Sequence, residues 1–167
     1  MKRYIRSNVY KWSDGSVINS DLPRSEFQEK YIAMLRLQKI LQYYICDSDT
    51  YTQLSNKVNE ALTADVFKGD INFTKDEKLL LYLISTYGSQ STASIIRQFS
   101  KYVPRLVHIS DDKYNYCGWT IQLVEDEDTE ETIWACISPT GDWDFSADSI
   151  AEAKNAINSA IFPYRPK

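Results

Sequence analysis

The spacing of apolar residues changes after Lys113, and that change constrains the fold more than any other feature. Before Lys113 apolar side chains recur every three or four residues, which is the period of amphipathic helices. After Lys113 they alternate with polar ones, as at Trp119 and Ile121, which is the period of strands with one buried face. The sequence therefore predicts an α+β protein, mainly helical over 1–109 and strand-containing over 110–167.

About four helices are expected in the first region. The longest starts at a capping box opened by Ser25 and carries its apolar stripe to Ile45. The next is capped by Asp49 or Thr50 and is expected to fold back on the first as a helical hairpin.

A second capping box, opened by Thr74, predicts a third helix that ends at Gly88 in the left-handed conformation. A fourth helix is expected to start at Ser91. The turn pair Asp14-Gly15 also predicts a short β-ribbon before the first helix.

The second region predicts an antiparallel ββ(β)α unit. Strands are expected over 119–123 and 133–137, joined by an acidic turn, with a short third strand at 143–145. A capping box at Ser149 opens a helix that should cover one face of the hairpin, because a two-stranded ribbon alone is marginal in water. The region boundary is expected in the loop 110–113.

Charge is divided unevenly between the two regions. Residues 1–109 hold 15 basic and 11 acidic side chains, whereas 110–167 hold 4 basic and 12 acidic ones. From Tyr114 to Ala153 there is no Lys or Arg among 40 residues. The carboxylates of that stretch are Glu125, Asp126, Glu127, Asp128, Glu130, Glu131, Asp142, Asp144, Asp148 and Glu152. A field of one sign bears on partners and solubility rather than on fold.

Composition indicates a folded cytoplasmic protein. With 43% hydrophobic and 13% aromatic residues in 167, the chain can bury a core. Its three cysteines lack paired spacing and its N-terminus lacks the layout of a signal peptide, so free thiols are expected. The longest apolar run, 79–84, is too short for a membrane span.

No catalytic or cofactor signature is present, so we expect neither an enzyme nor a bound cofactor or metal. His108 is the only histidine and is expected to be partly buried beside an apolar run. Neither Cys117 nor Cys136 has a glycine-rich oxyanion loop, and with His108 they would give zinc only three ligands. The sequence also lacks a calcium loop and glycine-rich phosphate motifs.

The segment 74–102 resembles the first two helices of a helix-turn-helix, with Gly88 in the turn and an Ala- and Ile-bearing helix after it. The resemblance implies a DNA contact by the second helix, which offers Arg97, Gln98 and Lys101. In this alternative the protein is a DNA-binding transcriptional regulator of a mobile element. Its further basic residues would be Lys2, Arg3, Arg6, Lys11 and Arg105.

The C-terminal unit resembles the AP2-type fold of three strands and a helix through 119–121, 133–135 and 145–153. Members of that family carry Arg and Lys on the strands to reach DNA phosphates. These strands carry none, and uncompensated carboxylates would repel a duplex. The resemblance therefore supports the topology and not the DNA-binding activity.

The leading hypothesis assigns function to the acidic surface. Its opening residues 1–7, its small size and its unit 119–161 make the chain resemble accessory proteins of phages and mobile elements, among them anti-CRISPR and other anti-defence inhibitors. The resemblance implies stoichiometric inhibition of a host nuclease complex by surface binding, and the charge of the acidic surface indicates that the partner offers a basic nucleic-acid site. Partner-binding residues are expected to be Glu125, Asp126, Glu127, Asp128, Glu130, Glu131, Asp142, Trp143 and Asp144. The oligomeric state stays open, with a dimer as one option.

Overall fold

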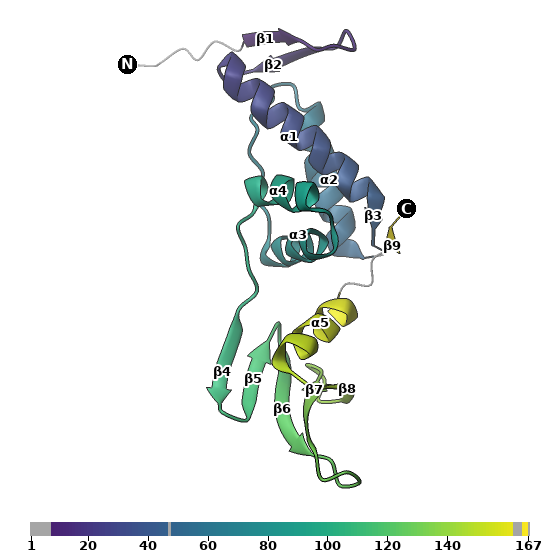
Figure 1. Ribbon diagram of the computed structural model, residues 1–167. Coiled ribbons are helices and arrows are strands. Elements are labelled where there is room, and N and C mark those ends of the chain that lie inside the picture. Colours follow the sequence, from purple (N-terminus) through teal and green to yellow (C-terminus); the bar gives the residue numbers. More distant parts are fainter. Residues whose placement is uncertain (1–7, 47, 162–164, 167) are drawn as a thin grey trace, which may run out of the picture. The chain divides into compact units, whose positions relative to one another are not determined.

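The computed structural model describes residues 8–46, 48–161 and 165–166 and divides the chain into two compact units (Figure 1). Unit 1 comprises the chain up to Lys101 together with the C-terminal residues from Tyr164. Unit 2 spans Tyr102–Pro163. The chain thus enters unit 2 earlier than the loop 110–113, because strand β4 before that loop belongs to the sheet of unit 2.

Unit 1 opens with an antiparallel hairpin of β1 (Asn8–Lys11) and β2 (Val17–Ser20), which confirms the expected ribbon within the described residues. Gly15 takes the left-handed conformation that the turn requires, with φ of 90°. The buried Ser20 hydroxyl donates to the carbonyl oxygen of Phe67 over 2.7 Å. This bond fastens the hairpin to the loop after the second helix.

Helix α1 (Arg24–Tyr43) is the longest element, and the capping box expected at Ser25 is wrong. Pro23 occupies the N-cap position without a side-chain cap, and its carbonyl accepts from Phe27 N over 2.8 Å. Pro23 has the non-helical backbone of an N-cap, with φ of −58° and ψ of 153°, but no side-chain oxygen that could accept from the first turn. Ring contacts on its buried side join Tyr10, Trp12, Phe27, Tyr31 and Phe67.

The chain leaves α1 through β3 (Tyr44–Ile45), which pairs with β9 (Arg165–Pro166). Helix α2 (Asp49–Thr63) follows, and the expected cap at Asp49 or Thr50 is wrong, because Ser48 is the N-cap and its hydroxyl accepts from Tyr51 N over 3.1 Å. It packs against α1, as expected.

Helices α3 (Lys75–Tyr87) and α4 (Gln90–Phe99) are joined by a two-residue turn. The capping box predicted at Thr74 is confirmed. The left-handed conformation predicted for Gly88 is wrong, because Gly88 is extended with φ of −84° and ψ of 174°. Glycine is still favoured there, because a Cβ would lie 2.6 Å from Thr92 Cγ2. Ser89 caps α4, two residues before the expected start.

Unit 2 is a five-stranded antiparallel sheet in which every strand pairs with its sequence neighbour. The predicted strands are present, and β4 and β5 extend the sheet beyond them, so the α+β class and the C-terminal strand-and-helix unit are confirmed. The strands are β4 (Leu106–Ser110), β5 (Lys113–Tyr116), β6 (Trp119–Glu125), β7 (Thr132–Ile137) and β8 (Trp143–Ala147).

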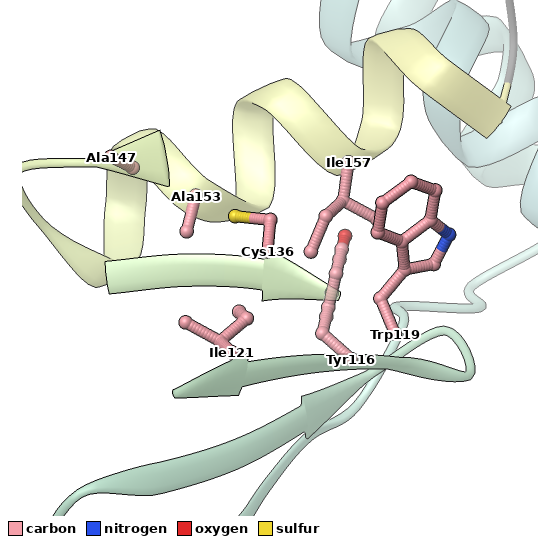
Figure 2. Close-up of a cluster of buried hydrophobic side chains, with 7 residues drawn as sticks. All are labelled: Tyr116, Trp119, Ile121, Cys136, Ala147, Ala153 and Ile157. Atoms are coloured by element: carbon pink, nitrogen blue, oxygen red, sulfur yellow. The ribbon is translucent and has the colours of Figure 1, made fainter. Parts of the chain in front are cut away.

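Helix α5 (Ile150–Ile161) packs on one face of this sheet and closes the core of unit 2 (Figure 2). The buried cluster is Tyr116, Trp119, Ile121, Cys136, Ala147, Ala153 and Ile157. The hydroxyl of Tyr116 donates to Asn158 Oδ1 over 2.8 Å inside this core. A buried polar pair of this kind fixes the helix at one position on the sheet.

Candidate functional site

The order of the strands decides where the carboxylates of unit 2 gather. In a meander, successive turns alternate between the two ends of the sheet. The β4–β5 and β6–β7 turns therefore lie at one end (Figure 1), and the antiparallel pairing of β8 with β7 places the connection from β8 to α5 at the same end. We call this end the acidic end. Its carboxylates are Asp111, Asp112, Glu125, Asp126, Glu127, Asp128, Glu130, Glu131, Asp148 and Glu152.

The β6–β7 turn is held by its own backbone. Asp126 N donates to Glu131 O over 2.7 Å, and Glu130 N donates to Asp126 O over 2.8 Å. Asp128 N donates to Asp126 Oδ1 over 3.0 Å. Only Asp126 of the six turn carboxylates is half-buried, and the others are exposed. The turn therefore presents its charges to solvent from a closed, hydrogen-bonded loop.

Few basic side chains among the described residues offset the negative charge of the acidic end. Lys113 is the only Lys or Arg in the sequence from 106 to 153. The contact described at this end joins His108 Nε2 to Asp111 Oδ1 over 3.4 Å and involves a histidine, not a permanently charged cation. Unpaired like charges on adjacent turns produce a strong negative potential outside the sheet end.

The structure separates Asp142, Trp143 and Asp144 from the acidic end. They belong to the β7–β8 turn and the start of β8, at the opposite end of the sheet. The length of β7 lies between, about 17 Å at the usual rise per strand residue. Trp143 is 55% exposed and its Nε1 donates to Ser146 Oγ over 3.0 Å. The nine residues expected to form one partner surface therefore occupy two ends.

His108 is exposed on β4, so the expectation that it is partly buried is wrong. Its ring meets that of Tyr114 edge-on, with centroids 5.2 Å apart. Two strands separate β4 from β7, which carries Cys136, and burial raises the pKa of the Cys136 thiol. Among the described residues no group of three or more His, Cys, Asp or Glu side chains is placed to hold a metal ion.

An ion pair in unit 1 joins a fully buried carboxylate to a partly exposed lysine. The fully buried Glu77 carboxylate lies 2.5 Å from Lys57 Nζ, and its Oε1 also accepts from Thr74 N over 2.8 Å. Burial alone would raise the pKa of Glu77, but the Lys57 ammonium and the Thr74 bonds outweigh it and hold that pKa below its usual range. Lys57 Nζ also donates to Asn72 O over 3.1 Å. This pair ties α2 to the start of α3.

The exposed side of α4 is polar and carries no carboxylate. Its exposed residues are Gln90, Ser91, Ser94, Arg97 and Gln98, and Lys101 is exposed just beyond its end. The chain has no Asp or Glu from Lys78 to Ser110. Of the cations expected to contact DNA, Arg97 and Lys101 belong to unit 1, whereas Arg105 precedes β4 in unit 2.

Sequence reasoning missed two cations on the neighbouring helix. Arg36 and Lys39 of α1 line a groove of about 530 Å³ together with Ser91, Ser94 and Gln98 of α4. Both lie on the side of α1 that stays exposed. Their helical spacing of three residues was available in the sequence, but the pairing of α1 with α4 was not.

No known protein family model matches the chain, and no curated protein or solved structure matches it either. Within the described ranges, every helix is too short or too polar to cross a lipid bilayer. The functions of the candidate surfaces are therefore inferred from the chemistry and geometry of this chain alone.

Proposed function

We propose that this protein is a non-catalytic inhibitor that binds the basic nucleic-acid-binding site of a bacterial nucleic-acid-targeting defence complex through its acidic end. One observation carries the proposal: the meander gathers ten carboxylates at one end of one sheet, eight from three connections and two from the adjoining ends of β6 and α5. This binding mode resembles that of anti-CRISPR proteins that compete with nucleic acid for a cationic channel.

The density of charge at the acidic end supports this mode of binding. Five strands spaced about 4.8 Å apart make the sheet end about 19 Å wide. Ten carboxylates at that end make a patch of one sign, as the phosphates of a DNA duplex do at one charge per about 1.7 Å of its axis. A cationic channel built for a duplex would therefore attract this end.

The field also sets the kinetics of the encounter. A one-signed patch accelerates association with an oppositely charged partner by about 10-fold to 1000-fold at low salt. Screening shortens the range of this attraction to about 8 Å at physiological ionic strength. Binding by the acidic end should therefore weaken steeply between low and high salt.

The test compares two charge-matched variants of the full chain. The first replaces Glu125, Glu127, Glu130 and Glu131 by Gln and Asp128 by Asn. Asp126 is kept, because its carboxylate accepts the Asp128 N–H and shapes the turn. The control makes the same kind of change, Glu to Gln and Asp to Asn, at five exposed carboxylates of unit 1. These are Asp21, Glu29, Glu60, Asp65 and Asp76.

Each tagged protein is presented to purified RNA-guided nucleases at low and high salt, and the retained nuclease and its DNA cleavage are measured. We expect the unchanged chain and the control to retain and inhibit one nuclease, and the first variant to lose at least about tenfold in affinity. Equal retention by both variants, or no retained nuclease, would contradict the proposal.

A second candidate function is nucleic-acid binding by unit 1, and the groove between α1 and α4 is the observation that favours it. Arg36 and Lys39 can reach phosphates, while the Ser and Gln side chains of α4 supply neutral donors for the backbone or for base edges. The helix-turn-helix order of α3 and α4 is compatible with this use.

Titration with duplex DNA at two salt concentrations tests the second candidate. Arg36→Ala with Lys39→Ala should lower affinity and reduce the salt slope by about 1 for each phosphate that the variant no longer neutralises. The matched control is Lys68→Ala with Lys75→Ala, which removes two exposed lysines of the same unit outside the groove. Identical salt slopes for the two double variants would rule out nucleic-acid binding by the groove.

A further inference from the structure

The hairpin at the start of unit 1 forms one wall of a cavity that neither candidate function uses. The cavity measures about 680 Å³, within the range of about 300–1,000 Å³ that small-molecule sites occupy. Its other wall is the start of α1, beside which the hairpin lies (Figure 1). The consecutive residues 8–12 line the cavity. Because successive side chains of a strand point to opposite faces, this run shows that the edge of β1 away from β2 faces the cavity.

Aromatic rings form a stack that ends at this cavity. Tyr10 lies on Phe27 with ring centroids 4.2 Å apart and planes 10° from parallel, and Phe27 lies on Tyr31 at 5.2 Å and 19°. Tyr10 and Trp12 are half-buried and line the cavity, whereas Phe27 and Tyr31 are buried. The rings are already held in place, so a planar ligand can add to them without the cost of ordering these side chains. Nucleobases bind aromatic side chains in this way, because every base has a π face.

The charge of the cavity is positive. Lys11 of β1 and Arg24 of α1 line it, and its described lining holds no Asp or Glu. Both residues are exposed, and no described ion pair involves either of them. A guanidinium can hold a phosphate by two parallel N–H bonds, and an ammonium adds a point charge. The two cations therefore favour a ligand that carries a phosphate.

Neutral polar groups lie at the same walls. Trp12 and Gln28 line the cavity, and no described hydrogen bond involves the indole N–H of Trp12 or the side-chain amide of Gln28. The edge of a nucleobase carries ring nitrogens and exocyclic groups that can pair with such donors and acceptors. A lipid chain would leave these groups and both cations without partners, and a simple anion would leave the aromatic stack unused. The combination therefore fits a nucleotide better than either.

We propose that this cavity binds a nucleotide, either free or at the end of a single-stranded nucleic acid. The base lies against Tyr10 and Trp12, and the phosphate lies at Lys11 and Arg24. The site belongs wholly to unit 1 and shares no lining residue with the groove between α1 and α4. It adds nucleotide binding to the protein and does not depend on the acidic end of unit 2.

Isothermal titration calorimetry of the full chain at low salt tests the site, with AMP and UMP as probes and with adenosine, ribose 5-phosphate and inorganic phosphate as their separate parts. At least one nucleotide should bind at least about tenfold more tightly than each part, because only a nucleotide uses both the rings and the cations. A short single-stranded oligonucleotide with a 5′-phosphate separates the two sources. Tighter binding than the mononucleotides supports a nucleic-acid end, and equal or weaker binding supports a free nucleotide. The proposal is overturned if neither nucleotide nor the oligonucleotide binds, or if inorganic phosphate binds as tightly.

A double variant locates the phosphate. Lys11→Ala with Arg24→Ala should weaken binding of the nucleotide at least about tenfold, since both cations are lost. Lys68→Ala with Lys75→Ala is the matched control, because it removes two exposed cations of the same unit outside the cavity, and its dissociation constant should be unchanged. Equal losses in the two double variants would mean that only the net charge of the protein attracts the ligand, which would contradict the site.

A second variant tests the cavity without touching its cations or its stacked rings. Val9→Glu places a carboxylate at the wall, and it should keep the fold because Val9 is 67% exposed. It should weaken nucleotide binding at least about tenfold, since the phosphate would meet a like charge. Val103→Glu is its control, because Val103 is 66% exposed and lies in unit 2. Circular dichroism confirms that each variant is folded, and unchanged binding by a folded Val9→Glu would overturn the proposal.

Discussion

The two units reach opposite surface charges by different routes. In unit 2 the acidic residues are close in sequence, and three connections of one meander bring them to the same end. In unit 1 the cations Arg36 and Lys39 come from α1, and only the packing of α1 on α4 places them in one groove with polar side chains of a helix far away in sequence. A hairpin turn thus concentrates charge locally, whereas a helix distributes its residues around an axis and depends on a neighbour to form a surface.

The largest effect is expected from a test of whether the two units unfold independently. Ile121→Ala removes a fully buried side chain from the core of unit 2 and should destabilise that unit by about 2–5 kcal/mol. Tryptophan fluorescence reports mainly on unit 2, which holds Trp119, Trp134 and Trp143. The urea unfolding midpoint measured by fluorescence should fall. The midpoint measured by the helical circular dichroism of unit 1 should stay unchanged.

Leu81→Ala is the counterpart in unit 1, because Leu81 is also fully buried. It should shift the dichroism midpoint and leave the fluorescence midpoint in place. If either substitution moved both transitions by the same amount, the two units would be one cooperative structure and their comparison would lose its basis.

The next largest effect concerns the buried charge of unit 1. Lys57→Met leaves the Glu77 carboxylate buried without its cation and should cost about 2–3 kcal/mol, less than the 3–5 kcal/mol of fully buried pairs because Lys57 is one-third exposed. Glu77→Gln in the same protein should recover part of this loss, since the remaining group is neutral. Urea unfolding of the single and double variants measures both, and no recovery would mean that the charge is not the cause.

The same pair gives unit 1 a pH dependence. The folded state holds the pKa of Glu77 below its ordinary value of about 4.3, so the stabilisation is complete above that pH and is lost as pH falls through the folded pKa. Below about pH 4.3, the thermal unfolding midpoint of Glu77→Gln should therefore fall less steeply with decreasing pH than that of the unchanged chain. Parallel pH profiles would contradict this assignment.

A smaller effect is expected where α5 meets the sheet of unit 2. Tyr116→Phe removes the hydroxyl that donates to the buried Asn158 Oδ1 and should cost about 1–3 kcal/mol, mainly from the amide oxygen left in the core. Asn158→Leu together with Tyr116→Phe replaces both partners by apolar groups and should cost less than the sum of the single changes. Additive losses would show that the bond does not position α5.

The smallest effect is a gain of stability in the acidic turn. Glu130 has φ of 58°, in the left-handed region that costs a residue with a side chain about 1 kcal/mol. Glu130→Gly should stabilise unit 2 by up to about 1 kcal/mol. Glu131→Gly removes the same charge without relieving strain and should be neutral or destabilising. Matching shifts in the two urea midpoints would mean that charge repulsion, not backbone strain, limits the turn.

Periodicity was enough to predict α2 and the strands β6 to β8, and capping residues added to it at α3 and α5, because these elements follow local patterns. Strands β4 and β5 were not predicted. Their apolar alternation is short, and β4 has one buried neighbour strand and one open edge. The start of α1 was misjudged for a local reason, since Pro23 opens the helix in place of the capping side chain that Ser25 suggested.

The candidate surfaces followed the same division. The six acids of the β6–β7 turn were predicted as one group because they are consecutive, and the turn keeps them together. Trp143 and its two neighbouring aspartates were assigned to the same surface, but the direction of β7 carries them to the opposite end. Arg36 and Lys39 were passed over because nothing near them in sequence indicates that α4 lies alongside.

By itself the sequence determined the class of the fold, the helices with clear apolar stripes and the uneven distribution of charge, since each follows from the order of neighbouring residues. Tertiary structure alone decided which charges share an end of the sheet, which cations share a groove and which strand is left at an edge. Those properties depend on contacts between segments distant in the chain. Such contacts arise when apolar faces are buried together, and surface residues occupy whatever positions that burial leaves them.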